Sequence, residues 1–418
     1  MTSLKKLTAV LAVSLPFMAA AQTPPAAPAA PPLAQIYGTL NVNLQYTEAS
    51  DATAAGANIS PRAAISIDST NIGVRGTLGV AEGLKVVYQC ETQASIDGED
   101  TRALCNRNSR VGLSGGWGTL FYGNWDTPYK ALAYGTKADD PMGNTDVFGY
   151  QGIFGSPGYG VRSTAFNGAA PSSATAGAIA ARAGFDQRAA NSVAYWTPKI
   201  SGLSGRVQYS VNEFRTADGR VDPQLLAAAV NFDAGGLSVG VAAEYHEDLL
   251  GLRAINAANA GTNAAKDLGL KLAAGYELPL AAGTLTVNGM VEQLTYEQEN
   301  AGAGFKDYSR LAWLVGAKFR TGKHEFRARY SQALDPDITA ASGTTLAPTA
   351  EDDLAAQQVA LAYAYHLAPS TQVFAFLTQI MNDDKAQYTF GVSGSSTVAA
   401  VPAGADPVAG GIGIRYAF

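Results

Sequence analysis

The sequence predicts an all-β fold: a 16-stranded antiparallel transmembrane β-barrel with one long loop folded inward. Apolar and polar residues alternate with a period of two along many segments, the pattern of strands that have one apolar and one polar face. Connections between these segments alternate between short turns and long loops. Mean hydropathy is +0.01, which suits a barrel because strand alternation hides the apolar content in the average.

The alternation is clearest in the segments 36–46, 237–246, 268–276 and 411–418. Charged residues such as Lys271 and Arg327 fall on the polar face, and tyrosines such as Tyr46 and Tyr416 close the apolar stripes. A soluble β-sandwich would also alternate. Water-exposed charges on one face and tyrosines at the stripe ends favour a lipid-facing barrel with aromatic girdles.

Sixteen candidate strands follow from this pattern. They begin near Ile36, Ser69, Leu84, Arg107, Thr119, Arg188, Leu203, Gln224, Leu237, Asp267, Thr284, Tyr308, His324, Leu354, Thr371 and Pro407. Short turns are expected at 80–83, 114–118, 233–236 and 320–323, and long loops at 49–62, 248–266, 335–353 and 382–406. Short turns on one side and long loops on the other are typical of outer-membrane barrels.

The N-terminus predicts export. Lys5 and Lys6 precede an apolar run, 7–21, that ends in small residues, so 1–21 reads as a secretory signal cut between Ala21 and Gln22. The run is too short for a transmembrane helix, which needs about 20 apolar residues. The Pro/Ala-rich segment 22–33 is expected to be an extended tether, and 34–418 to be the barrel.

Composition disfavours several other functions. A net charge of −6 does not suit nucleic-acid binding, which needs clustered positive charge. The three histidines have no metal-ligand spacing, and no nucleophile turn or phosphate-binding glycine loop is visible, so neither enzyme activity nor a cofactor or metal is expected. A barrel lipase would need a serine and a histidine side by side on the lipid-facing rim, and no sequence feature assigns His324 or His366 to that role.

The two cysteines, Cys90 and Cys105, suggest a disulfide. An exported chain passes through the oxidising periplasm, and the bond would close a loop of about 16 residues, worth about 3 kcal/mol by chain entropy. Two thiols without a nearby histidine provide too few ligands for a metal site.

The connection 126–187 shows no alternation and is rich in Gly, Ala, aromatic and acidic residues. A loop of that length without secondary structure is expected only when it is functional, and the lumen is its natural place in a barrel of this size. A substrate-specific channel for sugars or organic anions is the alternative function. It would need a stack of aromatic residues along the lumen, and the aromatic spacing in this loop shows no such stack.

Several motifs stand out along the chain: Ile36-Tyr37-Gly38, the segment 83–85 with Gln89, and the segments 111–120, 191–198 and 414–418. Together they resemble the motifs of the Gram-negative general porins, especially the betaproteobacterial branch. The resemblance covers the whole mature chain. It implies a homotrimeric, water-filled channel of the bacterial outer membrane for passive diffusion of small hydrophilic solutes and ions, with the third loop narrowing the pore.

The resemblance also implies a pore constriction in which wall bases face loop acids. Carried over by position, the bases are Arg75, Lys85, Arg107, Arg110 and Arg188, and the acids are Asp139, Asp140 and Asp146. Asn71 departs from the family, which often has Arg there, and this weakens the basic side. Opposed charges across a narrow aqueous neck would order water and disfavour apolar solutes. Plain solvation of each Arg is the simpler alternative.

The C-terminal stripe Ile412, Ile414, Tyr416 and Phe418 resembles the signal by which barrels are handed to their insertion machinery. The resemblance therefore gives Tyr416 and Phe418 an assembly role, unless Phe418 is only a girdle aromatic. Outer-membrane lipids, including lipopolysaccharide, are the other expected partners.

Overall fold

The computed structural model describes residues 34–67, 69–96, 103–137, 149–158, 184–211, 223–248, 265–298, 304–346, 350–390 and 400–418. The predicted signal, 1–21, and the predicted tether, 22–33, lie outside these residues. The predicted loop acids Asp139, Asp140 and Asp146 also lie outside them.

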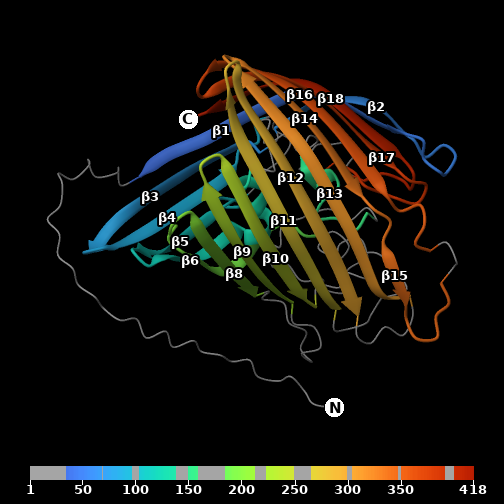
Figure 1. The fold of residues 1–418 in the computed structure, drawn as a ribbon, viewed down its shortest axis with the longest axis horizontal. Helices are drawn as coiled ribbons and strands as arrows, with labels where there is room; N and C mark the ends of the chain where they lie inside the picture. The colour runs from blue at the N-terminus through green and yellow to red at the C-terminus, as the bar shows by residue number, and fades with distance from the viewer. Residues whose placement is uncertain are drawn as a thin grey trace, which may run out of the picture.

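One antiparallel sheet closes on itself to form the barrel (Figure 1). Its strands are β1 Gln35–Ser50, β2 Ile59–Ser66, β3 Asn71–Ala81, β4 Leu84–Gln93, β5 Ser109–Gly115, β6 Gly118–Asp126, β7 Arg188–Trp196, β8 Leu203–Val211, β9 Gln224–Ala234, β10 Leu237–Glu247, β11 Ala265–Leu280, β12 Gly283–Gln298, β13 Phe305–Thr321, β14 His324–Ala333, β15 Asp337–Ala340, β16 Ala356–Ala368, β17 Thr371–Asn382 and β18 Asp406–Ala417. The first and last strands pair, with Leu40 opposite Tyr416, so the sheet has no free edge.

These 18 strands make sixteen spans. Strands β2 and β3 both pair with β1, Ser66 opposite Asn43 and Gly73 opposite Tyr37, so they are two halves of one span. Strands β14 and β15 are likewise two halves of one span beside β13. The predicted sixteen-stranded antiparallel barrel is therefore confirmed.

Two predicted loop boundaries were wrong. The second span begins at Ile59, inside the predicted loop 49–62, and the predicted loop 335–353 contains β15. The predicted start at Ser69 falls in the break between β2 and β3, where Ser69 has a φ of +54°. There the Thr70 hydroxyl accepts from the Asn41 N–H at 2.9 Å, replacing part of the strand ladder. Polar residues at this break interrupt the alternation, which hides the first half of the span.

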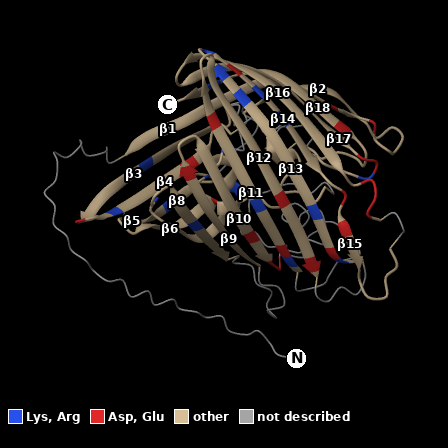
Figure 2. Ribbon diagram, viewed as in Figure 1, with Lys and Arg blue, Asp and Glu red and all other residues tan. Residues whose placement is uncertain are grey.

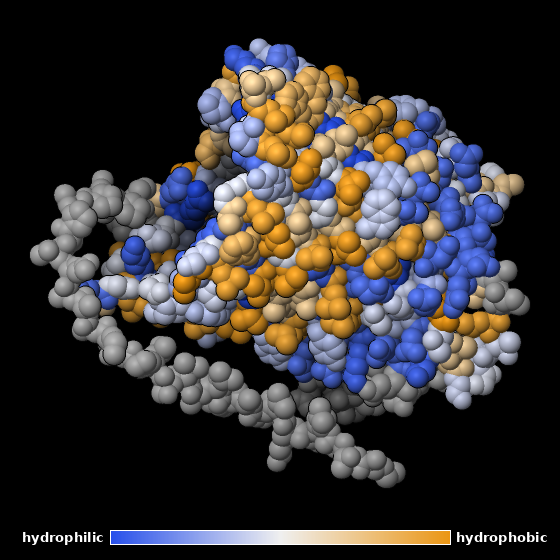
Figure 3. All heavy atoms as spheres, in the orientation of Figure 1, coloured by the Kyte–Doolittle hydropathy of each residue, from blue (hydrophilic) through white to orange (hydrophobic). Residues whose placement is uncertain are grey.

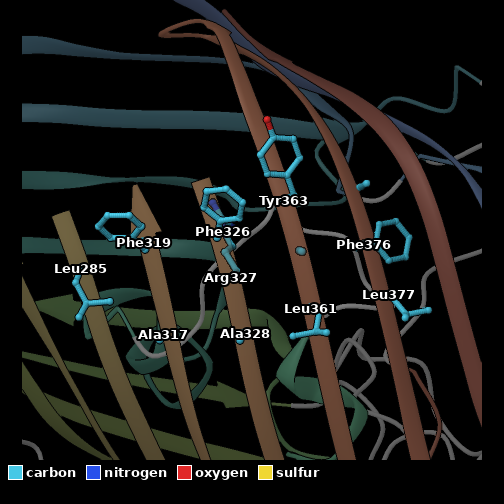
Figure 4. Close-up of a pocket in the computed structure, with 12 residues that line it drawn as sticks. Leu285, Ala317, Phe319, Phe326, Arg327, Ala328, Leu361, Tyr363, Phe376 and Leu377 are labelled. Carbon is cyan, nitrogen blue, oxygen red and sulfur yellow. The ribbon is translucent and has the colours of Figure 1, made fainter. Parts of the chain in front are cut away.

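The two faces of the wall differ as the alternation predicts. Apolar residues such as Leu377 and Ile412 are 56% and 64% exposed, whereas Asn41, Asn43 and Gln45 of β1 are buried on the other face. Figure 3 shows apolar residues along the middle of the visible face and hydrophilic residues toward its ends. On the outer face of β12–β17, Leu285, Phe319, Phe326, Leu361 and Tyr363 surround a shallow apolar hollow (Figure 4). This face suits contact with lipid.

Among the described residues, no helix is both long and apolar enough to cross a bilayer.

Cys90 and Cys105 are joined by a disulfide, with their Cα atoms 4.7 Å apart. The bond ties the end of β4 to the connection that leads into β5. Beside it, Arg107 pairs with Glu91 at 2.8 Å, and the Cys105 N–H donates to the Thr92 hydroxyl at 2.9 Å. This loop is therefore held to the barrel by covalent and polar contacts.

The C-terminal residue closes the barrel at its seam. Phe418 and Gly38 exchange two backbone hydrogen bonds of 3.0 Å, and the Phe418 ring stacks on Tyr416 with centroids 5.7 Å apart. The Phe418 side chain is 45% exposed on the outer face. The ring therefore lies on the apolar outer face and not inside the barrel.

Replacing Phe418 with Ala is expected to reduce insertion into the outer membrane several-fold and to leave export across the inner membrane intact, because the backbone seam stays while the exposed ring is lost. Heat-modifiability on gels of outer-membrane fractions measures insertion. The control is Phe326→Ala, which removes an outward aromatic that is 49% exposed on β14. Equal effects of the two changes would reduce Phe418 to a girdle residue.

Candidate pore constriction

The connection between β6 and β7 begins with a short helix that packs on the wall. Helix α1, Pro128–Gly135, starts where the Thr127 hydroxyl accepts from the Lys130 N–H and Pro128 takes a first-turn position. Tyr129 and Leu132 are buried against β9–β11. Gly240 of β10 admits the helix, because a Cβ there would lie 2.5 Å from the Leu132 Cδ1 atom. A predicted structureless stretch thus contains a docked helix.

Glu292 of β12 holds two separate parts of this connection. One carboxylate oxygen accepts from the Gly155 N–H at 2.8 Å, and the other accepts from the Tyr129 hydroxyl at 2.8 Å. Arg310 of β13 lies 3.2 Å from the same carboxylate and donates to the carbonyl oxygens of Ile153 and Ser156. All these side chains are fully buried. A single acid therefore links helix α1, the turn around η1 (Tyr150–Gly152) and the wall.

Lys271 of β11 completes a balanced set of charges. Its ammonium group pairs with Asp186 at 2.5 Å and lies 3.6 Å from Glu292, and it sits over the Tyr129 ring at 3.9 Å. The Tyr150 hydroxyl donates to Asp186 at 3.0 Å. Burial raises the pKa of Asp186 to about 6, although Lys271 opposes that shift. Two acids and two bases thus share one dry site, which we call the anchor: Asp186, Lys271, Glu292 and Arg310.

A second polar group fixes the end of the connection. The imidazole of His246 lies between Glu244, at 2.9 Å, and Asp267, at 3.6 Å, and contacts the Gln187 amide at 3.1 Å. The Phe185 ring stacks on the imidazole with centroids 4.4 Å apart. These contacts extend the hold on the connection to β10.

The groups that hold the connection all belong to one face of the wall. Glu244, Lys271 and Glu292 are buried, whereas the alternating residues Val241 and Leu270 are 51% and 47% exposed. The described parts of the connection therefore pack against the polar face, opposite the apolar outer stripes.

Two predicted bases lie on another part of the wall. Arg75 of β3 donates to the Gln35 side chain at 3.1 Å and sits over the Tyr37 ring at 4.4 Å. Lys85 of β4 is exposed, and within the described residues it has no ion-pair partner. Both lie on the same face of the β3–β4 pair as Gln89, which is directly opposite Arg75.

The other predicted bases have partners that the sequence did not suggest. Arg107 pairs with Glu91 at 2.8 Å, and Arg188 pairs with Asp126 at 3.1 Å. Arg110 instead faces three aromatic rings, considered below. The acids expected to face these bases, Asp139, Asp140 and Asp146, lie outside the described residues, so that pairing stays a prediction.

A sequence family described as Gram-negative porin matches residues 7–385. The chain belongs to the Gram-negative porins. Outer membrane porin protein 32 of Delftia acidovorans is 25% identical to this porin over 92% of the chain and 93% of its own length. The major outer membrane protein P.IB of Neisseria meningitidis serogroup B is 26% identical over 50% of the chain and 53% of its own length.

Solved structures share the fold of this porin. An anion-selective porin from Comamonas acidovorans superposes with a TM-score of 0.67 at 20% identity, over 92% of this chain and 99% of the other. A trimeric form of the Vibrio cholerae outer membrane protein OmpT superposes with a TM-score of 0.57 at 18% identity, over 92% and 99%. Its membership of the Gram-negative porin family and its similarity to the Delftia porin over most of the chain make this protein an outer-membrane porin, as its sequence predicted.

Sequence reasoning missed the anchor of this porin. Lys271 was recognised only as a residue of the polar face, and Asp186, Glu292 and Arg310 were not singled out. The available signal was a charged residue at a central polar position of three successive strands, β11, β12 and β13. Directly opposed positions, such as Lys271 and Glu292, place those charges beside one another.

Replacing Glu292 with Ala is expected to free the anchored connection, because removing one partner of a buried ion pair costs about 3–5 kcal/mol. Hydrogen exchange of the amides in 149–158 should accelerate by roughly 100-fold or more. Mass spectrometry of the detergent-solubilised porin measures it. Glu297→Ala, on the exposed face of the same strand, is the matched control. Unchanged exchange in Glu292→Ala would show that the anchor does not hold this segment.

Proposed function

We propose that the segments 127–137, 149–158 and 184–187 lie inside the barrel and narrow it to a neck through which small hydrophilic solutes and ions diffuse. The observation that carries this proposal is the anchor, which ties the connection to the polar face of the wall at three points, Tyr129, the turn 153–156 and Asp186. A connection held by four buried charges at one site is a permanent part of the channel in this account.

The wall bases that form no ion pair with a described residue indicate the charge balance of the proposed neck. On the described wall, Glu91, Asp126, Glu292 and Glu325 each contact a basic side chain. Lys85, Arg110 and Arg206, by contrast, form no ion pair with any described residue. Figure 2 shows charges of both signs along the strands. With Asp139, Asp140 and Asp146 on the loop side, Arg75 and Lys85 would set a transverse field that orders water and orients solutes.

The assembly in this proposal is a homotrimer. The fold shared with a trimeric outer-membrane protein supports it, and each barrel would form its own pore. Native mass spectrometry of the preparation used for recording is expected to show three chains.

Charge changes on the two sides of the neck should move ion selectivity in opposite directions. Asp139→Asn, Asp140→Asn and Asp146→Asn together should favour anions, and Arg75→Gln with Lys85→Gln should favour cations. Opposite unit charges about 8 Å apart interact by about 2 kcal/mol at an effective dielectric constant of 20, and water weakens this. We therefore expect each multiple variant to change the anion-to-cation permeability ratio by roughly twofold or more.

Reversal potentials of single channels in a planar bilayer under a salt gradient measure this ratio. Glu297→Gln, on the exposed outer face, removes a charge away from the neck and serves as the control. Wild-type reversal potentials in both multiple variants would place these residues away from the constriction and remove the basis of the proposed mechanism.

A further inference from the structure

The guanidinium of Arg110 lies in a box of aromatic rings. Its Cζ atom is 5.0 Å from the Phe121 centroid, 4.5 Å from Trp125 and 4.7 Å from Trp196. The three rings meet edge to face, with centroids 4.9–5.4 Å apart. Three rings from two strands, β6 and β7, thus surround one charged group of β5.

The box supplies no hydrogen-bond acceptor. The Nε and Nη1 atoms of Arg110 are buried and have no hydrogen-bond partner, and Arg110 forms no ion pair with a described residue. Its neighbours Arg107 and Arg188 do have carboxylate partners. Contact with ring faces stabilises the positive charge, but it supplies no acceptor for the N–H groups of the guanidinium.

A second guanidinium stands beside the same indole. Arg206 of β8 has its Cζ atom 5.2 Å from the Trp196 centroid and also forms no ion pair with a described residue. Trp196 is directly opposite Arg206 across β7 and β8, so both point to one face of the wall. Val111 and Tyr122, at the alternating positions of β5 and β6, are 57% and 61% exposed on the opposite, outer face. The two arginines are therefore on the lumen side.

This combination fits a particular class of solute. A carboxylate can accept from Nη2 of Arg110, the guanidinium nitrogen that is not buried, and from the guanidinium of Arg206. The partly exposed indoles of Trp125 and Trp196 offer an apolar surface. A halide ion would use only the charge. Resting on the function proposed above, we propose that Arg110, Arg206, Trp125 and Trp196 form a binding site for small aromatic carboxylates that pass through the channel.

Benzoate is the probe, and acetate is the same anionic group without a ring. In bilayer recordings in potassium chloride, benzoate should reduce the single-channel current of the wild type in a saturable manner and acetate should do so weakly. Arg110→Gln should raise the half-inhibitory benzoate concentration about tenfold, the scale of one lost charge-assisted hydrogen bond. Arg110→Lys keeps the charge but loses the planar guanidinium that lies against the three rings and presents Nη2, so it should also be impaired.

The matched control is Arg415→Gln. It removes the same charge from β18, and within the described residues Arg415 has no aromatic ring at cation–π distance. Its half-inhibitory concentration should stay within about twofold of wild type. Equal weakening by Arg110→Gln and Arg415→Gln would mean that benzoate senses only net charge, and it would overturn the site.

Two further outcomes also decide the proposal. In the background Asp139→Asn, Asp140→Asn, Asp146→Asn, the change Arg110→Gln should have the same effect as in the wild type. An effect that vanishes there would show that Arg110 serves the loop acids and would overturn the solute site. Normal chloride conductance without benzoate inhibition would overturn the site alone, whereas absence of any conductance would instead contradict the proposed channel.

Discussion

In hydrocarbon no water is available to pair a backbone N–H or C=O, and this constraint determines the architecture of the chain. Every span must be bonded on both sides, so the first strand must meet the last, as Leu40 and Tyr416 do. Phe418 adds two backbone bonds to Gly38 at the same seam. Once the sheet is closed, period-two alternation gives the barrel one face for lipid and one for water.

Closure also creates an enclosed polar surface on which a long connection can be held. Buried charges are costly unless they are paired, and the anchor pairs Asp186 and Glu292 with Lys271 and Arg310. Hydroxyl and backbone groups of the connection occupy the remaining bonding positions around Glu292. Without the connection, these buried wall charges would lose some of their partners. Because the connection supplies those partners, the same charges hold it in one place.

The sequence predicted most of the strands because their alternation depends only on which face meets lipid. It failed where that signal is absent, at the break around Thr70 and at β15, and it did not predict helix α1 despite the Thr127-Pro128 start. The sequence did not predict the partners of Arg107 and Arg188, because Glu91 and Asp126 come close to these arginines only through strand pairing. The anchor likewise depends on strand pairing, which brings the charged inner-face positions of β11, β12 and β13 to the same level of the barrel wall.

The central proposal is that the described segments of the β6–β7 connection lie inside the barrel. Gly152→Cys with Ile380→Cys tests it directly, because a Cβ at Gly152 would lie 3.0 Å from the Ile380 Cδ1 atom on the buried face of β17. Non-reducing mass spectrometry of isolated outer membranes should find the two positions joined by a disulfide or a short thiol crosslinker. Gly152→Cys with Leu377→Cys, which points outward, should stay unjoined. Crosslinking only to position 377, or to neither position, would contradict the account.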